Sequence, residues 1–122
     1  MNLTTPELEI MQALWKLGEC TAPEVHRAVD TQRSISYSAV KTMIDRLEAK
    51  GAIRRVRQEG RSIVIEASIG PETVEASMLD RLVNGLFAGD RRPMFTSLLR
   101  DEELTQEDLD YLESLIRERR ND

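Results

Sequence analysis

The sequence predicts a mainly α-helical protein with one small β-hairpin. Three observations support this fold class. Apolar residues recur at helical spacing in three segments before residue 51, two short β-branched runs flank Gln58-Glu59-Gly60, and helical spacing returns after Gly70-Pro71. Because Gly-Pro breaks regular structure, we expect one domain over residues 1–70 and a second, all-helical domain over residues 71–122.

The first two predicted helices have recognisable ends. Thr4 or Thr5 can cap the first helix, and Gly18 can end it. The second helix opens with a Thr-x-x-Glu capping box formed by Thr21 and Glu24. The apolar stripe of the first helix is Ile10, Met11, Leu14 and Trp15. We expect its tryptophan to be a core anchor and not a ligand-binding residue.

The third predicted helix has one apolar and one polar face. Ser36 is a favourable N-cap, and Gly51 is a favourable C-terminal stop. The face predicted to be buried consists of Val40, Met43, Ile44 and Leu47. The face predicted to point outward consists of Ser38, Lys41, Thr42 and Asp45, with Arg46 at its edge.

The predicted hairpin is rich in arginine. Its first strand does not alternate cleanly, because Ile53 and Val56 lie three residues apart. We therefore expect either that Ile53 belongs to the preceding turn or that a β-bulge intervenes. In the second strand, Ile63 and Ile65 should share one face.

Charge is unevenly distributed along the chain. The net charge is −5, but residues 1–70 carry 10 Lys/Arg and 9 Asp/Glu, whereas residues 71–122 carry 7 and 13. From Arg33 to Arg61 there are 8 basic and 3 acidic residues, a local charge of +5. Since charges are screened over about 8 Å at physiological salt, this local excess permits binding to nucleic acid despite the acidic total.

Three helices followed by a basic hairpin are typical of a winged helix-turn-helix, whose third helix enters the major groove of DNA. Arg46 could bind a guanine with both arms of its guanidinium group. The hairpin residues expected to neutralise phosphates are Arg54, Arg55, Arg57 and Arg61. The pattern alone leaves two alternatives open: the charged surface is merely solvated, or the domain is a protein-docking module that never binds DNA.

The C-terminal helices carry more apolar surface than about 50 residues can bury by themselves. We therefore expect a helical dimerisation region in which a second copy covers these stripes, with packing back onto the chain's own winged domain as the alternative. The residues expected at the dimer interface are Met78, Leu79, Leu82, Leu86, Phe87, Leu98, Leu109, Leu112, Leu115 and Ile116.

Other function classes lack a sequence pattern. No apolar run approaches the roughly 20 residues of a membrane span, and the first residues do not resemble a secretory signal, so we expect a cytoplasmic protein. HExxH, P-loop and GxGxxG motifs are absent, so we expect no enzymatic activity, cofactor or metal. Cys20 is expected to be a structural or idle thiol, and His26 a structural or exposed histidine.

Several of these segments together resemble the penicillinase repressor family of the BlaI/MecI type, to which the copper-responsive CopY repressors are related. The resemblance covers nearly the whole chain in the same order. The segments that carry it are Leu3–Val25, Ser36–Gly51, Gly60-Arg61, Leu86–Asp90 and Leu98–Leu112.

The resemblance implies a homodimeric transcriptional repressor that binds a palindromic operator and blocks RNA polymerase. The family's DNA contacts map onto Ser36, Ser38, Lys41, Thr42 and Arg46, with the wing arginine at Arg61. In the antibiotic-resistance branch, a membrane-bound, β-lactam-sensing metalloprotease starts derepression, and the repressor is cut in its C-terminal region. The candidate cleavage site here is Ser97-Leu98, where the family usually has Asn-Phe.

Two features differ from the family pattern. No cysteine follows Cys20, so we do not expect copper sensing through thiolates. The second strand reads Ile63-Val64-Ile65 where the family often has an aromatic residue. An alternative function is a winged-helix regulator gated by a small molecule lodged between the winged domain and the dimer helices, with Pro93, Met94 and Phe95 lining the pocket.

Overall fold

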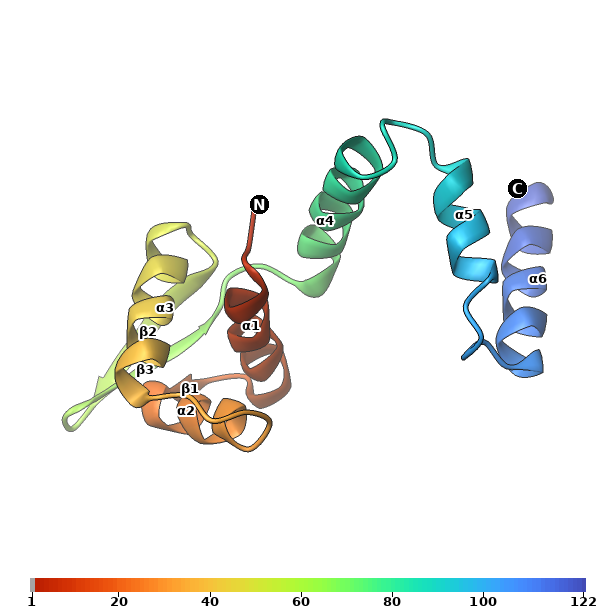
Figure 1. The fold of residues 1–122 in the computed structure, drawn as a ribbon. Helices are drawn as coiled ribbons and strands as arrows, with labels where there is room; N and C mark the ends of the chain where they lie inside the picture. Colours follow the sequence, from red (N-terminus) through yellow and green to blue (C-terminus); the bar gives the residue numbers. More distant parts are fainter. Residues whose placement is uncertain (1) are drawn as a thin grey trace. The chain divides into compact units, whose positions relative to one another are not determined.

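The computed structural model describes residues 2–122, which form six helices and three short strands (Figure 1). In chain order these are α1 (Thr5–Leu17), β1 (Cys20–Thr21), α2 (Ala22–Asp30), α3 (Tyr37–Ala49), β2 (Ile53–Glu59), β3 (Ser62–Ala67), α4 (Pro71–Gly85), α5 (Arg92–Leu99) and α6 (Gln106–Arg120). This arrangement confirms the mainly α fold class with a small β-hairpin.

The chain divides into two compact units, Met1–Leu79 and Asp80–Asp122. The first unit extends past the expected boundary at Gly70-Pro71 because the first turns of α4 pack against this unit. Val74 belongs to the core of this unit, and Met78 packs against that core. The functional division into a DNA-binding and a dimerisation part stays a prediction.

Helices α1 to α3 begin where their capping residues predict. The Thr4 hydroxyl accepts from the Glu7 N–H, and the Thr4 N–H donates to the Glu7 carboxylate. The Glu24 carboxylate accepts from the N–H and hydroxyl of Thr21, and the Ser36 hydroxyl accepts from the Ala39 N–H. Each side chain satisfies a backbone group that a helix start leaves unpaired.

The sheet has three strands in the order β1-β3-β2 (Figure 1). Strand β1 was not expected from the sequence; Cys20 pairs with Ile65, and Thr21 pairs with Val64. Such a two-residue strand has no periodicity to reveal it, because its partner is distant in the chain.

The hairpin confirms one sequence expectation and corrects another. The register shifts between Arg55 and Arg57, which is the irregularity that the spacing of Ile53 and Val56 predicts. The expected turn at Gln58-Glu59-Gly60 is wrong: Gln58 and Glu59 belong to β2, and Gly60-Arg61 forms a two-residue turn. Gly60 has φ = 61°, a left-handed conformation that suits the twist of a short hairpin.

The core of the first unit lies between α1, α2, α3 and the sheet. Its largest fully buried side chains are Ile10, Met11, Leu14, Val25, Val40, Leu47 and Val74. Trp15 packs at the margin of this core, and its Nε1–H donates to the Ile69 carbonyl oxygen at 2.9 Å. This contact joins α1 to the segment that follows the hairpin, in agreement with the expected anchor role.

Glu7 is a buried carboxylate that ties the start of α1 to the end of α3. Only 3% of the residue is exposed, and both carboxylate oxygens lie 2.8 Å from Lys50 Nζ. Burial alone raises the pKa of Glu7, but hydrogen bonds from Lys50 and Thr4 and the Lys50 charge outweigh it. The pKa of Glu7 is therefore below its ordinary value.

We expect Glu7→Gln to lower the free energy of unfolding by about 1–3 kcal/mol at pH 7, because hydrogen bonds to a charged, buried group are lost. The pKa of Glu7 is lower in the folded than in the unfolded chain. This stabilisation is therefore present above the ordinary pKa of 4.5 and disappears as the pH falls through the folded value.

Urea unfolding of both proteins at pH 7 and pH 3 measures this effect, and the difference should narrow at pH 3. The control is Glu9→Gln, which breaks the pair between the half-buried Glu9 and the exposed Arg33 and should cost under about 1 kcal/mol. A Glu7→Gln difference of equal size at both pH values would contradict the role of the carboxylate charge.

Cys20 in β1 is buried and free, as expected for a structural thiol. Burial, followed by the nearby Glu24 charge, raises the pKa of the Cys20 thiol to about 11. Because the thiolate is the reactive form, we expect Ellman's reagent at pH 8 to leave the folded protein unmodified and to react with one thiol after unfolding. Rapid reaction of the folded protein would contradict this placement.

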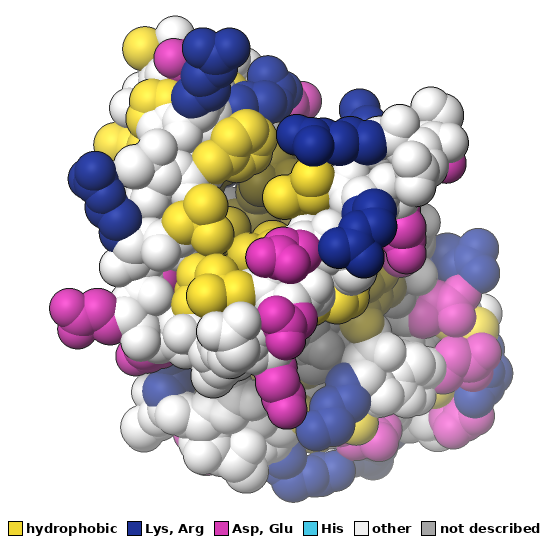
Figure 2. Space-filling model, turned by 90° about the vertical axis from the view of Figure 1, so that its right-hand side faces the viewer, with side chains coloured by type: hydrophobic (Ala, Val, Ile, Leu, Met, Phe, Trp, Pro, Cys, Tyr) yellow, Lys and Arg dark blue, Asp and Glu magenta, His cyan; other side chains and the backbone are white. Residues whose placement is uncertain are grey.

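The second unit contains the end of α4 together with α5 and α6. Thr105 and Asp108 form the capping box of α6. In Asp80–Asp122, Val83 is the only buried hydrophobic residue among those the structure describes. Figure 2 shows hydrophobic side chains gathered at the centre of the face that carries the C-terminal helices, with charged side chains around them.

Within residues 2–122, no helix combines the length and apolarity needed to cross a lipid bilayer.

Candidate nucleic-acid interface

The polar face of α3 is exposed because its apolar face is held in the core. Val40, Ile44 and Leu47 are buried, and the residues on the opposite side point to solvent. Of the α3 residues predicted to contact DNA, Ser38, Thr42 and Arg46 are exposed and Lys41 is half-buried. Ser36, the N-cap, is also exposed.

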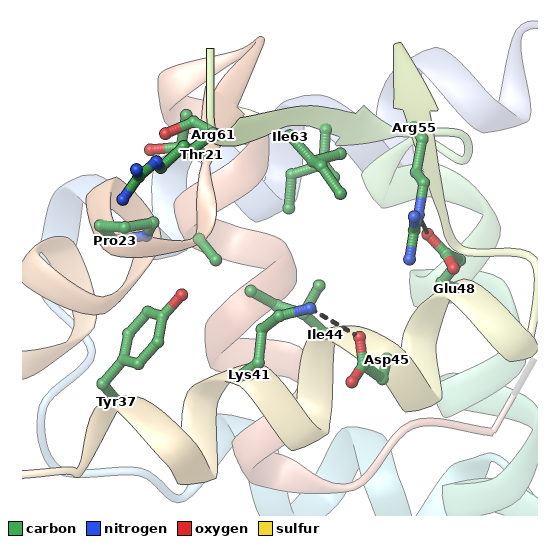
Figure 3. Close-up of a pocket in the computed structure, with 13 residues that line it drawn as sticks. Thr21, Pro23, Tyr37, Lys41, Ile44, Asp45, Glu48, Arg55, Arg61 and Ile63 are labelled. Atoms are coloured by element: carbon green, nitrogen blue, oxygen red, sulfur yellow. Dashed lines mark hydrogen bonds and ion pairs between the residues drawn. The ribbon is translucent and has the colours of Figure 1, made fainter. Parts of the chain in front are cut away.

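A groove of about 210 Å³ lies between α3, the hairpin and the start of α2 (Figure 3). Lys41 lines it from α3, Arg55 from β2 and Arg61 from the hairpin turn. Thr21 and Tyr37 also line it, and Figure 3 shows these side chains around the same opening. Three basic residues that lie far apart in the sequence therefore share one groove.

Arg54 and Arg57, two other predicted phosphate contacts, do not line this groove. Arg54 Nε donates to Glu66 across the hairpin at 2.6 Å. Arg57 is held by Glu19 through its Nη1 and by Glu59 through its Nε, and these carboxylates raise the pKa of its guanidinium group. Arg57 thus links the hairpin to the segment just before β1.

Two groove cations are also paired. Lys41 Nζ lies 3.0 Å from Asp45 Oδ1, and Arg55 Nε lies 2.9 Å from Glu48 Oε2 (Figure 3). Within the described part of the chain, Arg46 and Arg61 have no ion-pair partner. Among the basic residues predicted to contact DNA, these two can therefore bind DNA without first breaking an ion pair with a carboxylate of the described chain.

The hydroxyl groups at the start of α3 are partly engaged with their own helix. Ser36 Oγ caps the helix and lies 3.3 Å from Ser38 Oγ, while the Thr42 hydroxyl donates to the Ser38 carbonyl oxygen at 2.9 Å. Each hydroxyl keeps capacity for a further hydrogen bond. This arrangement can contact base edges or phosphates without unwinding the helix.

His26 supports the approach to α3. Its Nε2 lies 2.7 Å from the Ile35 carbonyl oxygen, and its ring meets Tyr37 edge-on, with the centroids 5.8 Å apart. This agrees with the structural role expected from the sequence. In residues 2–122, no cluster of His, Cys, Asp or Glu is arranged to hold a metal ion.

Sequence reasoning missed the carboxylates that accompany the basic residues. The i,i+4 spacing of Lys41 and Asp45 on a helix could have revealed one pair. The pair of Arg55 and Glu48 joins β2 to α3, and no local pattern signals it. Tyr37 was also missed as a groove residue, because it lies next to the cap of α3 and shows no periodicity.

The predicted dimer residues differ in exposure. Leu79, Leu82, Leu86, Leu98, Leu115 and Ile116 are exposed, whereas Met78, Phe87, Leu109 and Leu112 are half-buried. The candidate cleavage bond Ser97-Leu98 lies near the end of α5, and the Leu98 carbonyl oxygen accepts from the Asp101 N–H. Pro93 and Phe95 are exposed on the same helix, and Met94 is half-buried.

Comparisons with known proteins agree with this geometry. The family model described as penicillinase repressor matches residues 3–118. The penicillinase repressor of Bacillus licheniformis is 27% identical over 124 residues, covering 98% of this chain and 93% of that protein.

Two solved structures share the fold. The monomeric form of B. licheniformis BlaI, solved in complex with the blaP half-operator, is 29% identical with a TM-score of 0.51, covering 59% of this chain and 87% of that one. Wild-type MarR from E. coli in its apo form is 17% identical with a TM-score of 0.53, covering 96% of this chain and 78% of that one. The likeness to MarR shows the winged-helix fold alone.

Proposed function

We propose, because this chain belongs to the penicillinase repressor family, that it represses transcription by binding a palindromic DNA operator as a homodimer. One observation carries the proposal: the exposed face of α3 and the hairpin turn present Lys41 and Arg61 to the same groove. A DNA duplex that received α3 in its major groove would place its backbone beside the hairpin.

The roles of the basic residues follow from their surroundings. Arg46 is exposed and unpaired within residues 2–122, so its guanidinium group is free to bind a guanine edge. Arg61 is equally free, and its place in the hairpin turn suits a phosphate contact. The half-operator complex of the related BlaI protein supports the same general mode of binding.

The apolar C-terminal helices support the homodimer. Leu86 is 73% exposed, Ile116 is 53% exposed and Leu79 is 52% exposed. Helices with so little buried apolar surface gain stability when a second copy covers them. A two-fold dimer would place its α3 helices in major-groove segments about 34 Å apart, or a multiple of that distance.

We further propose that cleavage in the C-terminal region relieves repression, with a sensor-activated protease as the partner. Both residues of the Ser97-Leu98 bond are exposed. The bond lies inside a short helix without buried residues, so local unwinding would be inexpensive. Cutting there would separate α6 from α4, and each half of the operator would then be bound by a single chain.

Selection of bound fragments from genomic DNA tests the function. We expect a near-palindromic site, together with an affinity that falls steeply as salt is raised. Loss of full-length protein in cells exposed to a β-lactam would support proteolytic release. A thermal shift with a small effector, without cleavage, would support the small-molecule-gated regulator instead, and absence of binding to any duplex would contradict both.

A further inference from the structure

The groove between α3 and the hairpin contains carboxylates as well as cations. Lys41, Arg55 and Arg61 contribute three positive charges, and Asp45 and Glu48 contribute two negative ones. The groove is therefore +1, whereas its basic residues alone would make it +3. Figure 3 shows both acidic side chains beside the cations with which they pair.

These carboxylates occupy the groups that phosphate would use. Arg55 Nε already donates to Glu48, and Lys41 Nζ already donates to Asp45. A phosphate that approaches either cation must replace the carboxylate or tolerate its charge at short range. Either event reduces the gain from releasing counterions, which is the sequence-independent part of DNA affinity.

We propose that Asp45 and Glu48 act as built-in competitors of the DNA backbone and set a low affinity for DNA of arbitrary sequence. This inference rests on the proposed DNA-binding function. Arg46 is outside these pairs within the described residues, so the base contact proposed for Arg46 does not compete with either carboxylate. A single chain bound to one half-site is then held weakly, and firm binding requires both halves of a dimer.

A purely structural role predicts the opposite result. The pair between Glu48 and Arg55 joins α3 to β2, so it could serve only to hold the hairpin in position. Breaking the pair would then loosen the hairpin and weaken DNA binding. If Glu48 competes with phosphate, removing its charge strengthens binding to DNA.

The test measures the affinity of the full chain for a duplex of arbitrary sequence, about three helical turns long, across a salt series. We expect Glu48→Gln to bind roughly two- to fivefold more tightly at low salt, the factor that corresponds to an exposed ion pair. The slope of the logarithm of the binding constant against the logarithm of the salt concentration should become steeper by up to about 0.9 for each freed cation. Asp45→Asn, which frees Lys41, should act in the same direction.

The matched control is Glu9→Gln. It removes the same charge and breaks a similar pair, since Arg33 Nε lies 2.8 Å from Glu9 Oε2, but neither residue lines the groove. We expect this variant to bind the duplex like the wild type. In an Arg55→Gln background, Glu48→Gln should give no increase, because the cation that it would free is absent.

Unchanged or weaker binding by both Glu48→Gln and Asp45→Asn, with normal unfolding curves, would overturn the inference while the DNA-binding function stands. An increase in Glu9→Gln equal to that in Glu48→Gln would also overturn it, because only net charge would then matter. If the wild type bound no duplex even at low salt, the proposed function itself would fail.

Discussion

Ile116→Asp is expected to convert the dimer to a monomer and to lower the affinity for a palindromic operator by about 10²–10⁴-fold, because losing the second chain removes the effective concentration that links the two half-sites. Ile116 lies on α6 and is 53% exposed within its own chain, so the substitution should leave the fold of that chain intact. In the proposed dimer the new carboxylate would be buried without a partner.

Ser114→Asp is the matched control for this prediction. It adds the same charge to the same helix, but at an exposed polar position on the side away from the apolar stripe. Sedimentation velocity should show a monomer for Ile116→Asp and a dimer for Ser114→Asp. A dimer in both cases would reject α6 as part of the interface.

Arg46→Ala is expected to produce the second large effect, a loss of about 1–3 kcal/mol for each recognition helix that contacts a guanine. Its guanidinium group is exposed on α3 and has no carboxylate partner within residues 2–122. The substitution therefore breaks no ion pair inside the chain. The loss should be confined to the selected operator. Binding to a duplex of arbitrary sequence should fall much less, because phosphate contacts dominate there.

Arg61→Ala provides the contrasting case. Arg61 lies in the hairpin turn and is expected to contact phosphate, so its removal should weaken operator and arbitrary DNA alike. It should also make the slope of the logarithm of the binding constant against the logarithm of the salt concentration shallower, by about 0.9 for each phosphate that the side chain no longer neutralises. Equal behaviour of Arg46→Ala and Arg61→Ala across both DNAs would reject this division between base and phosphate recognition.

Local interactions account for the features that could be read from the sequence. The caps at Thr4, Thr21 and Ser36 were recognisable, because a cap depends on residues three positions apart. The buried stripe of α3 was equally clear, since helical periodicity is a local property. Most of the fold class and the outward face of α3 therefore followed from neighbouring residues alone.

Long-range pairing accounts for the rest. Strand β1 exists because Cys20 and Thr21 pair with β3. Gln58 and Glu59 belong to strand β2, and not to the turn, because of the register in which β3 pairs with β2. The charge state of the groove is likewise a property of three dimensions. Arginines that look alike in sequence differ in space: Arg61 is free in the described chain, while Arg55 is held by a carboxylate from another element. Composition counts charges, but only the packing of α3 against the hairpin determines which of them neutralise one another.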